Sequence, residues 1–289
     1  MRYPHILAAI RSAKWAITPA TLQAIRDTLS SRLAQSYVRI QDGAPSDPDD
    51  DNGIPVIPKG YDIIAPGVAC VAVSGIIGKR LDALSMMCGG CDLDCVEENF
   101  AAALSDPAVS SVILHFDTPG GVITGVPELA TKIKAAAALK PVFAFCDTLC
   151  ASAGYWLASA CTGIACTPSA DVGSIGVYMA LIDESEHWAD KGYELVLIKA
   201  GEQKAAGIAG SKISAKQIAI WQGEIDTCYA MFTSAVTGCR PDIESATMQG
   251  QTFMGDAALA AHLVDDVIPD LATLAAQLTV AVPAMLSKA

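Results

Sequence analysis

The stretches SVILHFDTPGG (residues 111–121) and PVFAFCDTLCASAGYWLAS (residues 141–159) decide the fold of this chain. Each opens with a short run of aliphatic and aromatic residues, which is typical of a strand buried on both faces. Each then passes into small residues, where such a strand gives way to a loop or a helix. Three more short apolar runs, at residues 68–73, 163–166 and 194–198, predict further strands of the same kind.

Stretches with apolar residues at helical spacing separate these strands. They predict helices at residues 96–104, 126–138, 152–160 and 184–191, then a long helix at 215–236 and a short one at 256–262. Strands that alternate with helices form a mostly parallel sheet with right-handed crossovers. The sequence therefore predicts an α/β fold with helices around the sheet.

Composition and charge narrow the class of protein. Apolar residues make up 52 % of the 289 residues and aromatic residues 6 %, which predicts a core of small aliphatic side chains and excludes intrinsic disorder. A net charge of −12 argues against nucleic-acid binding through a basic surface. No apolar stretch approaches the roughly 20 residues of a membrane span. Arg11 and Lys14 stand too early for a signal peptide, so the sequence predicts a cytoplasmic protein.

Four segments are expected along the chain. Residues 1–40 carry six basic residues and one acidic residue, and helical spacing at 21–33 predicts a helical N-terminal arm. This arm either binds a neighbouring subunit or partner, or is simply a solvated helix. Residues 41–59 begin with QDGAPSDPDDDN and read as an acidic, Pro-containing linker. The main domain is expected over residues 60–270, with a C-terminal tail over 271–289.

A candidate nucleophile stands where the second quoted stretch passes into a helix. Ser152 follows a strand and a short loop, and its neighbours Ala151, Ala153 and Gly154 are small enough to let a substrate carbonyl approach. Unpaired amides and the helix dipole favour negative charge at such a position. The alternative is that Ser152 only caps the helix, which is the commonest role of a serine there.

The first quoted stretch supplies candidate partners for an oxyanion. Gly120 and Gly121 follow a buried strand, and without side chains they let a ligand approach while their amides point at it. The alternative is a plain turn after a strand. Lys204, in KAGEQKAAG at residues 199–207, is a candidate general base if an apolar pocket desolvates it. The alternatives are an ordinary exposed loop lysine, and Lys199 as the base.

Histidine is the usual base for a serine nucleophile, but none of the four stands in a segment typical of a catalytic loop. They are His5, His115, His187 and His262. A lysine base therefore fits this chain better. A separate cluster, CGGCDLDC, brings Cys88, Cys91 and Cys95 to ligand-like spacing, yet a fourth ligand would have to come from afar. We expect reduced thiols there, and no metal or cofactor.

The segments DTPGG, ASAGYW, VGSIGV (residues 172–177) and GEQKAAG, in this order, resemble the signal peptide peptidase A family. The resemblance covers residues 60–268 and is strongest to the phage and prophage branch of head-maturation, or capsid assembly, peptidases. It implies a ClpP/crotonase-like fold, a spiral of ββα units with a mostly parallel sheet. Gly250-Gln251 and residues 262–265 depart from the family pattern, which leaves details of subunit contacts open.

The resemblance also implies roles for individual residues. Ser152 resembles the nucleophile, Lys204 the general base, and Ser174 the hydroxyl that orients the lysine. Gly120 or Gly121, with an amide near Ser152, would form the oxyanion hole. The strand at Gly121 and Val122 would pair with an extended substrate. In half-length relatives the dyad is completed between neighbouring subunits, so a homo-oligomeric ring is expected.

The expected function is that of a serine endopeptidase that works through an acyl-enzyme with a Ser–Lys dyad. Its substrates would be phage scaffold, portal or capsid proteins or other unstructured peptides, cut in the host cytoplasm or within a procapsid. Two alternatives stay open. One is a crotonase-like acyl-CoA enzyme, although the ASAGYW segment lacks the usual carboxylate. The other is a non-catalytic ring or assembly protein on the same fold.

Overall fold

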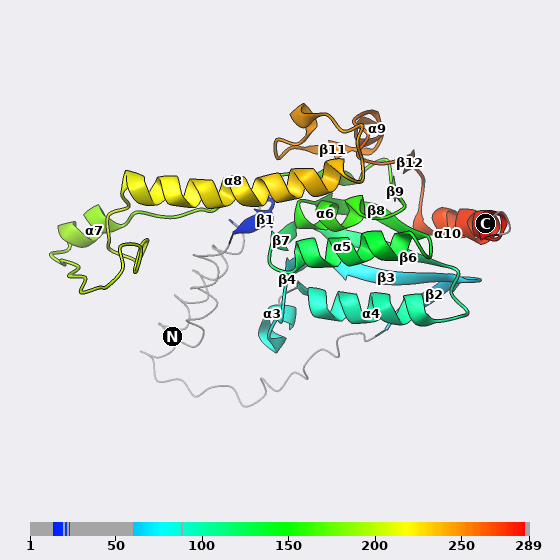
Figure 1. Cartoon of the computed structure of the whole chain (residues 1–289), viewed down its shortest axis with the longest axis horizontal. Coiled ribbons are helices and arrows are strands. Elements are labelled where there is room, and N and C mark those ends of the chain that lie inside the picture. The colour runs from blue at the N-terminus through cyan, green and yellow to red at the C-terminus, as the bar shows by residue number, and fades with distance from the viewer. Residues whose placement is uncertain (1–13, 20, 22, 24–59, 88, 287–289) are drawn as a thin grey trace, which may run out of the picture.

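The computed structural model describes residues 14–19, 21, 23, 60–87 and 89–286, and the side chains of residues 83, 84 and 281–286 are not described (Figure 1). Most of the helix predicted over residues 21–33, and the linker predicted over 41–59, therefore lie outside the described residues. Within the described part of the chain, no helix is both long and apolar enough to cross a membrane.

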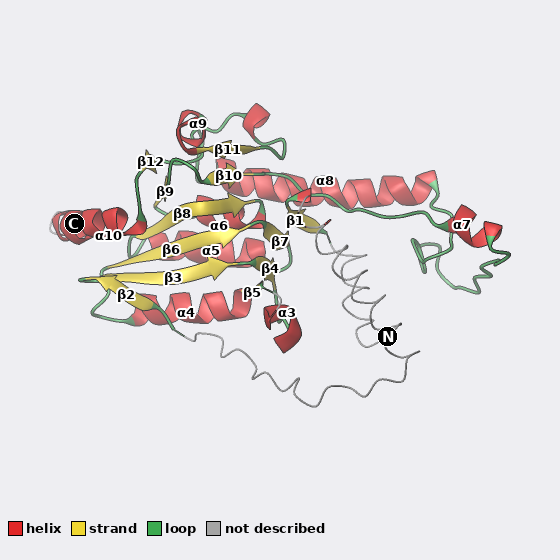
Figure 2. Ribbon diagram, turned by 180° about the vertical axis from the view of Figure 1, so that it is seen from behind, coloured by secondary structure: helices red, strands yellow, loops and turns green. Residues whose placement is uncertain are grey.

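Four of the five predicted strands are confirmed, and they form the centre of one large sheet (Figure 2). They are β3 (Val68–Ser74), β6 (Ser111–Thr118), β8 (Val142–Ala151) and β9 (Gly163–Cys166). β3, β6, β8 and β9 pair in parallel, as predicted. Further short strands that periodicity did not predict extend this sheet: β2 (Asp62–Ala65), β10 (Asp171–Gly173), β11 (Thr252–Met254) and β12 (Asp266–Val267).

The six helices predicted for the main domain are also confirmed. They are α4 (Leu93–Ser105), α5 (Val126–Ala137), α6 (Ala153–Ser159), α7 (Ser185–Asp190), α8 (Ala215–Thr237) and α9 (Gly255–Ala260). α4, α5 and α6 lie together on one face of the sheet (Figures 1 and 2). α5 shows why: Val126, Leu129, Ala130 and Ile133 are all buried, and this spacing lines one side of a helix. The sheet and these helices share one large apolar core.

Residues 271–286, expected as part of a tail, form helix α10 (Leu271–Leu286). Leu274, Ala275 and Leu278 on it are buried against Val68, Ile113 and Phe145 of the sheet. This contact is on the face of the sheet opposite α4, α5 and α6 (Figure 2). The other short helical elements are α3 (Ala83–Met87) and a 3₁₀ turn at Ser245–Thr247.

A second, smaller sheet lies beside the carboxyl ends of β3 and β6. Its strands, in order, are β1 (Trp15–Ile17), β7 (Gly120–Val122), β4 (Ile76–Gly78) and β5 (Gly90–Asp92). β7, β4 and β5 pair in parallel, whereas β1 pairs with β7 in antiparallel fashion. Part of the predicted helical arm is thus an edge strand that contributes to this sheet.

The strand predicted at residues 194–198 is wrong. The segment has no regular secondary structure and all its side chains except Leu195 are exposed, with Val196 at 74 % and Ile198 at 99 %. Its apolar run has no neighbouring strand to pair with in the described part of the chain. It belongs to residues 181–220, a segment that contains α7 and the start of α8 and projects away from the sheet (Figure 1). We call this segment the projecting arm.

Candidate active site

Ser152 occupies an unusual backbone conformation at the junction of β8 and α6. Its φ of 57° and ψ of −116° lie outside the regions that residues with a side chain normally adopt, at a cost of about 1–3 kcal/mol. Two hydrogen bonds hold it: the Ser152 amide donates to the Gly173 carbonyl oxygen at 2.7 Å, and the Trp156 amide donates to the Ser152 carbonyl oxygen at 2.9 Å. The surrounding structure therefore maintains a strained turn at this serine.

The side chain of Ser152 does not cap the helix. It makes no capping hydrogen bond, which overturns the simplest alternative for this residue. The residue is 1 % exposed, and its hydroxyl donates only a long hydrogen bond, 3.4 Å, to the Gly176 carbonyl oxygen. A buried hydroxyl on a strained turn, held by so weak a contact, is free to engage a reacting group.

Gly120 lies directly against Ser152. A methyl group built on Gly120 would stand 2.9 Å from Ser152 Cβ, 3.0 Å from the Ala153 amide nitrogen and 2.2 Å from the Ala16 carbonyl oxygen. Its φ of 93° also belongs to the region that favours glycine. The Pro-Gly-Gly turn and the start of α6 therefore lie in direct contact, and only glycine at position 120 allows this close approach.

The backbone amides of the two glycines have different partners. The Gly120 amide donates to Thr118 Oγ1 at 3.1 Å, so it is already engaged. The Gly121 amide belongs to the ladder between β7 and β1, opposite Ala16. If a substrate strand replaced β1, its carbonyl oxygen would take the place of the Ala16 oxygen. The Gly121 amide, with the Ala153 amide at the start of α6, is thus the better candidate of the two glycines to stabilise an oxyanion.

Close packing explains why two further positions near the site are glycine. A methyl group on Gly121 would stand 1.9 Å from the Ile77 carbonyl oxygen, so only glycine lets β7 approach β4. A methyl group on Gly154 would stand 2.3 Å from Thr118 Cγ2, so only glycine lets α6 approach the end of β6. The sequence analysis used Gly154 only as a small neighbour of the nucleophile, and this packing contact with Thr118 was missed.

Ser174 lies next to the nucleophile through the pairing of β10 with β8. Gly173 is opposite Ala151 in that parallel pair and accepts the Ser152 amide, and Ser174 follows it in the chain. Ser174 is buried, has a φ of 54°, and donates its amide to the Gln251 carbonyl oxygen at 2.7 Å. The structure therefore brings Ser152, Gly120, Gly121 and Ser174 together.

Lys204 is not brought to this group within one chain. It is exposed in the projecting arm, in a loop whose Glu202 forms an ion pair with Lys216 at the start of α8. Phe232, near the other end of α8, stacks on Trp156 of α6. At about 1.5 Å of rise per residue, the segment of α8 between Lys216 and Phe232 is roughly 24 Å long. Lys204 thus stands well outside the region of Ser152.

The other titratable candidates do not join the site. His115 Nε2 lies 3.0 Å from a carboxylate oxygen of Asp147, on the main sheet. Cys91 is buried in β5, Cys95 lies in α4, and Cys88 is outside the described residues. Among the residues that the structure describes, no group of three or more His, Cys, Asp and Glu could hold a metal ion.

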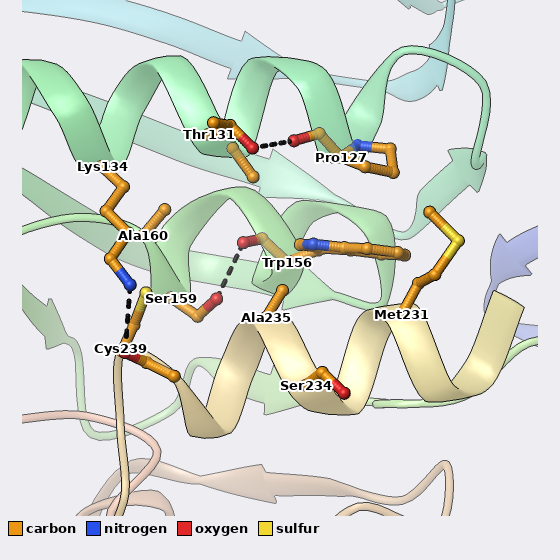
Figure 3. Close-up of a pocket in the computed structure, with 12 residues that line it drawn as sticks. Pro127, Thr131, Lys134, Trp156, Ser159, Ala160, Met231, Ser234, Ala235 and Cys239 are labelled. Carbon is orange, nitrogen blue, oxygen red and sulfur yellow. Dashed lines mark hydrogen bonds between the residues drawn. The ribbon is translucent and has the colours of Figure 1, made fainter.

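A separate cleft of about 320 Å³ lies between α5, α6 and α8 (Figure 3). Its lining includes Trp156, Thr131, Lys134 and Met231. None of the residues gathered around Ser152 lines this cleft, so it is distinct from the candidate active site. The sequence analysis did not predict it, because it forms only where three separate helices meet.

The sequence analysis also missed β1, which completes the surface beside Ser152. Three apolar residues are too few for a periodic pattern, so nothing but the short run Trp15–Ile17 marked it. Its antiparallel partner is the strand of Gly120, Gly121 and Val122, the strand that the resemblance assigned to substrate binding.

Two phage proteins are similar to this chain in sequence. The chain is 34 % identical to capsid assembly protease C of Escherichia phage lambda, over 75 % of this chain and 50 % of that protein. It is 31 % identical to the head-tail preconnector protein GP5 of Enterobacteria phage P21, over 71 % of this chain and 41 % of that protein. The chain thus spans about half the length of these relatives.

A similar solved structure is that of an enoyl-CoA hydratase/isomerase family protein from Silicibacter pomeroyi. It has 17 % sequence identity and a TM-score of 0.43, over 77 % of this chain and 82 % of that one. Residues 134–280, about half of the chain, match the profile of peptidase family S49. This chain belongs to peptidase family S49.

Proposed function

We propose that this protein is a serine endopeptidase that cleaves peptide bonds through an acyl-enzyme on Ser152. The observation that carries the proposal is the strained, buried turn at Ser152, packed against Gly120 and next to the Ala153 amide. Strain of this kind persists where the position of a side chain matters for function. Membership of a peptidase family gives that position its chemistry.

In the proposed reaction, a substrate segment lies along β7, and Ser152 Oγ attacks the carbonyl carbon of one of its peptide bonds. The amides of Gly121 and Ala153 stabilise the negative charge that develops on the carbonyl oxygen. The hydroxyl proton passes to a base and then to the leaving amine, and water hydrolyses the ester that remains. Ser174 is buried and follows Gly173, which accepts the Ser152 amide, and we assign to it the role of orienting that base.

We propose that the base is Lys204 of a neighbouring copy. Lys204 sits on the projecting arm. This arm exposes several large apolar side chains, among them Ile182, Tyr193, Val196, Ile198 and Ile218. A cluster of exposed apolar side chains is typical of a surface that binds another protein. Burying them against another copy would carry Lys204 out of water. Loss of water favours the neutral amine, which is the form that accepts a proton. A homo-oligomer, closed as a ring, would thus complete each site between two subunits.

Relatives at more than 30 % identity carry the names capsid assembly protease and head-tail preconnector protein. We propose by extension that this protein acts on proteins of a phage head, such as scaffold, portal or capsid proteins. β7 already receives β1 as an antiparallel strand, so an extended substrate segment that replaced β1 would gain the same backbone hydrogen bonds.

The test is cleavage of an unstructured protein such as casein, followed by mass spectrometry, with the parent, Ser152→Ala and Lys204→Ala proteins. The proposal expects cleavage by the parent and loss in both variants, with oligomers of unchanged size. A co-expressed mixture of the two variants should then recover roughly a quarter of the parent activity, because a site between copies can combine one serine with the other copy's lysine. Recovery would not occur if both residues had to come from one chain.

Cleavage that survives in Ser152→Ala would overturn the nucleophile. Cleavage that survives in Lys204→Ala, with Ser152 still required, would overturn the base only. A parent without any peptidase activity as an intact oligomer, on casein and on phage-head proteins alike, would overturn the proposed function.

A further inference from the structure

β1 fills a slot between two backbone edges. On one side, β1 pairs with β7, so that Trp15 lies opposite Val122, Ala16 opposite Gly121 and Ile17 opposite Gly120. On the other side, the Trp15 amide donates to the Tyr178 carbonyl oxygen and the Tyr178 amide to the Trp15 carbonyl oxygen, both at 3.0 Å. β1 is thus the edge strand of the small sheet, and one isolated bridge to Tyr178 holds its outer side, so that both of its backbone neighbours belong to the main domain.

The slot also accommodates the side chains of β1. Trp15 and Ile17 are buried in a small apolar cluster with Ile76, Val122, Tyr178 and Ala180, separate from the large core. Ala16 points the opposite way, as alternate residues of a strand do, and has no exposed surface. The slot therefore takes a large apolar residue, a small residue and an aliphatic residue in succession.

The position of the Ala16 carbonyl group links this slot to the nucleophile. The point where Gly120 would carry a methyl group is 2.2 Å from the Ala16 oxygen, 2.9 Å from Ser152 Cβ and 3.0 Å from the Ala153 amide nitrogen. These three atoms therefore lie close together on one side of Gly120. Thr18 donates to Pro119 and Ile123 donates to Lys14 along the same ladder, so alternation makes Ala16 and Gly121 a hydrogen-bonded pair too. The Gly121 amide thus faces the Ala16 oxygen.

We propose that β1 is bound as a substrate of its own chain and that the bond between Ala16 and Ile17 is the one presented to Ser152. Resting on the proposed function, the reaction begins when Ser152 Oγ attacks the Ala16 carbonyl carbon and its proton passes to the base. The bond from Ala16 to the Ile17 nitrogen breaks, and the amine of Ile17 leaves with that proton. Water then hydrolyses the ester, which releases the Ala16 carboxylate and restores Ser152.

Two consequences follow for the substrate class. First, other substrates would carry the same succession, a large apolar residue, Ala and an aliphatic residue, around the cleaved bond. Second, β1 excludes them while it occupies the slot, so cleavage after Ala16 clears the site. Because Lys204 of the same chain is remote from Ser152, the segment stays intact until copies assemble.

The test compares the full-length parent, Ser152→Ala and Ala16→Phe proteins, with Ala101→Phe on the exposed side of α4 as the matched control. Intact mass and N-terminal sequencing report the cut, and casein cleavage is measured on the same preparations. The parent and Ala101→Phe should show a new N-terminus at Ile17. Ser152→Ala should show at least a 100-fold lower extent of that cut. Ala16→Phe should lose the cut, because its side chain does not fit the closed slot and the bond after residue 16 is then no longer held beside Ser152.

The outcomes separate the two proposals. If the parent cleaves casein while residues 14–18 stay joined, or are cut at another bond, the assignment of β1 is overturned and the proposed function stands. If Ala16→Phe is still cut after residue 16 at the parent rate, the small subsite is wrong and the assignment falls with it. If neither casein nor the chain itself is cut, the proposed function fails as well.

Discussion

Trp156 stacks on Phe232 with ring centroids 4.5 Å apart and an angle of 6° between the ring planes. Trp156 lies one turn into α6, the helix that begins after Ser152, and Phe232 lies in the second half of α8. The contact therefore joins the helix of the nucleophile to the helix whose first half supports the projecting arm. The reach and direction of that arm depend on how α8 is anchored here.

Replacing Phe232 by Ala should destabilise the protein by about 3–5 kcal/mol, because Phe232 is fully buried and the change leaves a cavity beside Trp156. Urea unfolding followed by circular dichroism measures this loss. Met231→Ala is the matched control: its side chain is 48 % exposed on the same helix, and the change should cost under about 1 kcal/mol. Equal effects of the two changes would show that the stack does not anchor α8.

Gly121→Ala should abolish peptidase activity even where the protein still folds. The added methyl group would meet the Ile77 carbonyl oxygen at 1.9 Å, so β7 must move away from β4 and take the proposed oxyanion amide with it. A loss of at least about 100-fold in kcat is expected, as for removal of an oxyanion donor. Casein cleavage by the purified oligomer measures it.

Gly223→Ala in α8 is the control for this change. Nothing lies within 4 Å of a methyl group at that position, and Ala in place of Gly stabilises a helix by up to about 1 kcal/mol. Full activity of Gly121→Ala would contradict the role of β7 as the rigid edge beside Ser152.

The thiol of Cys91 should resist alkylation in the folded protein. Burial raises the pKa of Cys91 to about 12 and that of Cys70 to about 11, so at pH 8 both remain thiols, the unreactive form. Iodoacetamide followed by peptide mapping should label Cys239, which is only half-buried, well before either of them. Labelling of Cys91 as fast as Cys239 would show that β5 opens readily.

Asp183 should stabilise the projecting arm down to low pH. Hydrogen bonds from the amides of Ile213 and Ser185 lower the pKa of Asp183 to about 2, from an ordinary value of 3.8. The folded pKa lies below the unfolded one, so this contribution is fully present above about pH 4 and is lost as the pH falls through about 2. Hydrogen exchange should therefore show that residues 211–214 lose protection in this range.

The matched variant for this prediction is Asp183→Asn, which keeps an acceptor oxygen but carries no charge. Protection of residues 211–214 in that variant should be lower at pH 6 and should not change between pH 5 and 2, apart from any change shared with α5. A variant that follows the parent across this range would show that another group titrates.

Much of the fold could be predicted because its signals are local. The apolar runs of β3, β6, β8 and β9 are buried on both faces, and such runs read as strands without knowledge of their neighbours. The segment at residues 194–198 carries the same signal and still forms no strand, because a strand needs a partner edge and no described strand pairs with it. β1 shows the converse, since three residues without a pattern become a strand when two edges receive them.

The amino-acid sequence by itself determined the α/β class, the order of the main strands and helices, and the candidate residues Ser152, Gly120, Gly121, Ser174 and Lys204. All but Ser174 follow from residue type and from position along the chain, whereas Ser174 is a candidate only through the resemblance to the signal peptide peptidase A family. Only the tertiary structure decided that four of them meet while Lys204 projects elsewhere, and that β1 lies beside the nucleophile. Such relationships depend on which distant segments pack together, and no local pattern of side chains records them.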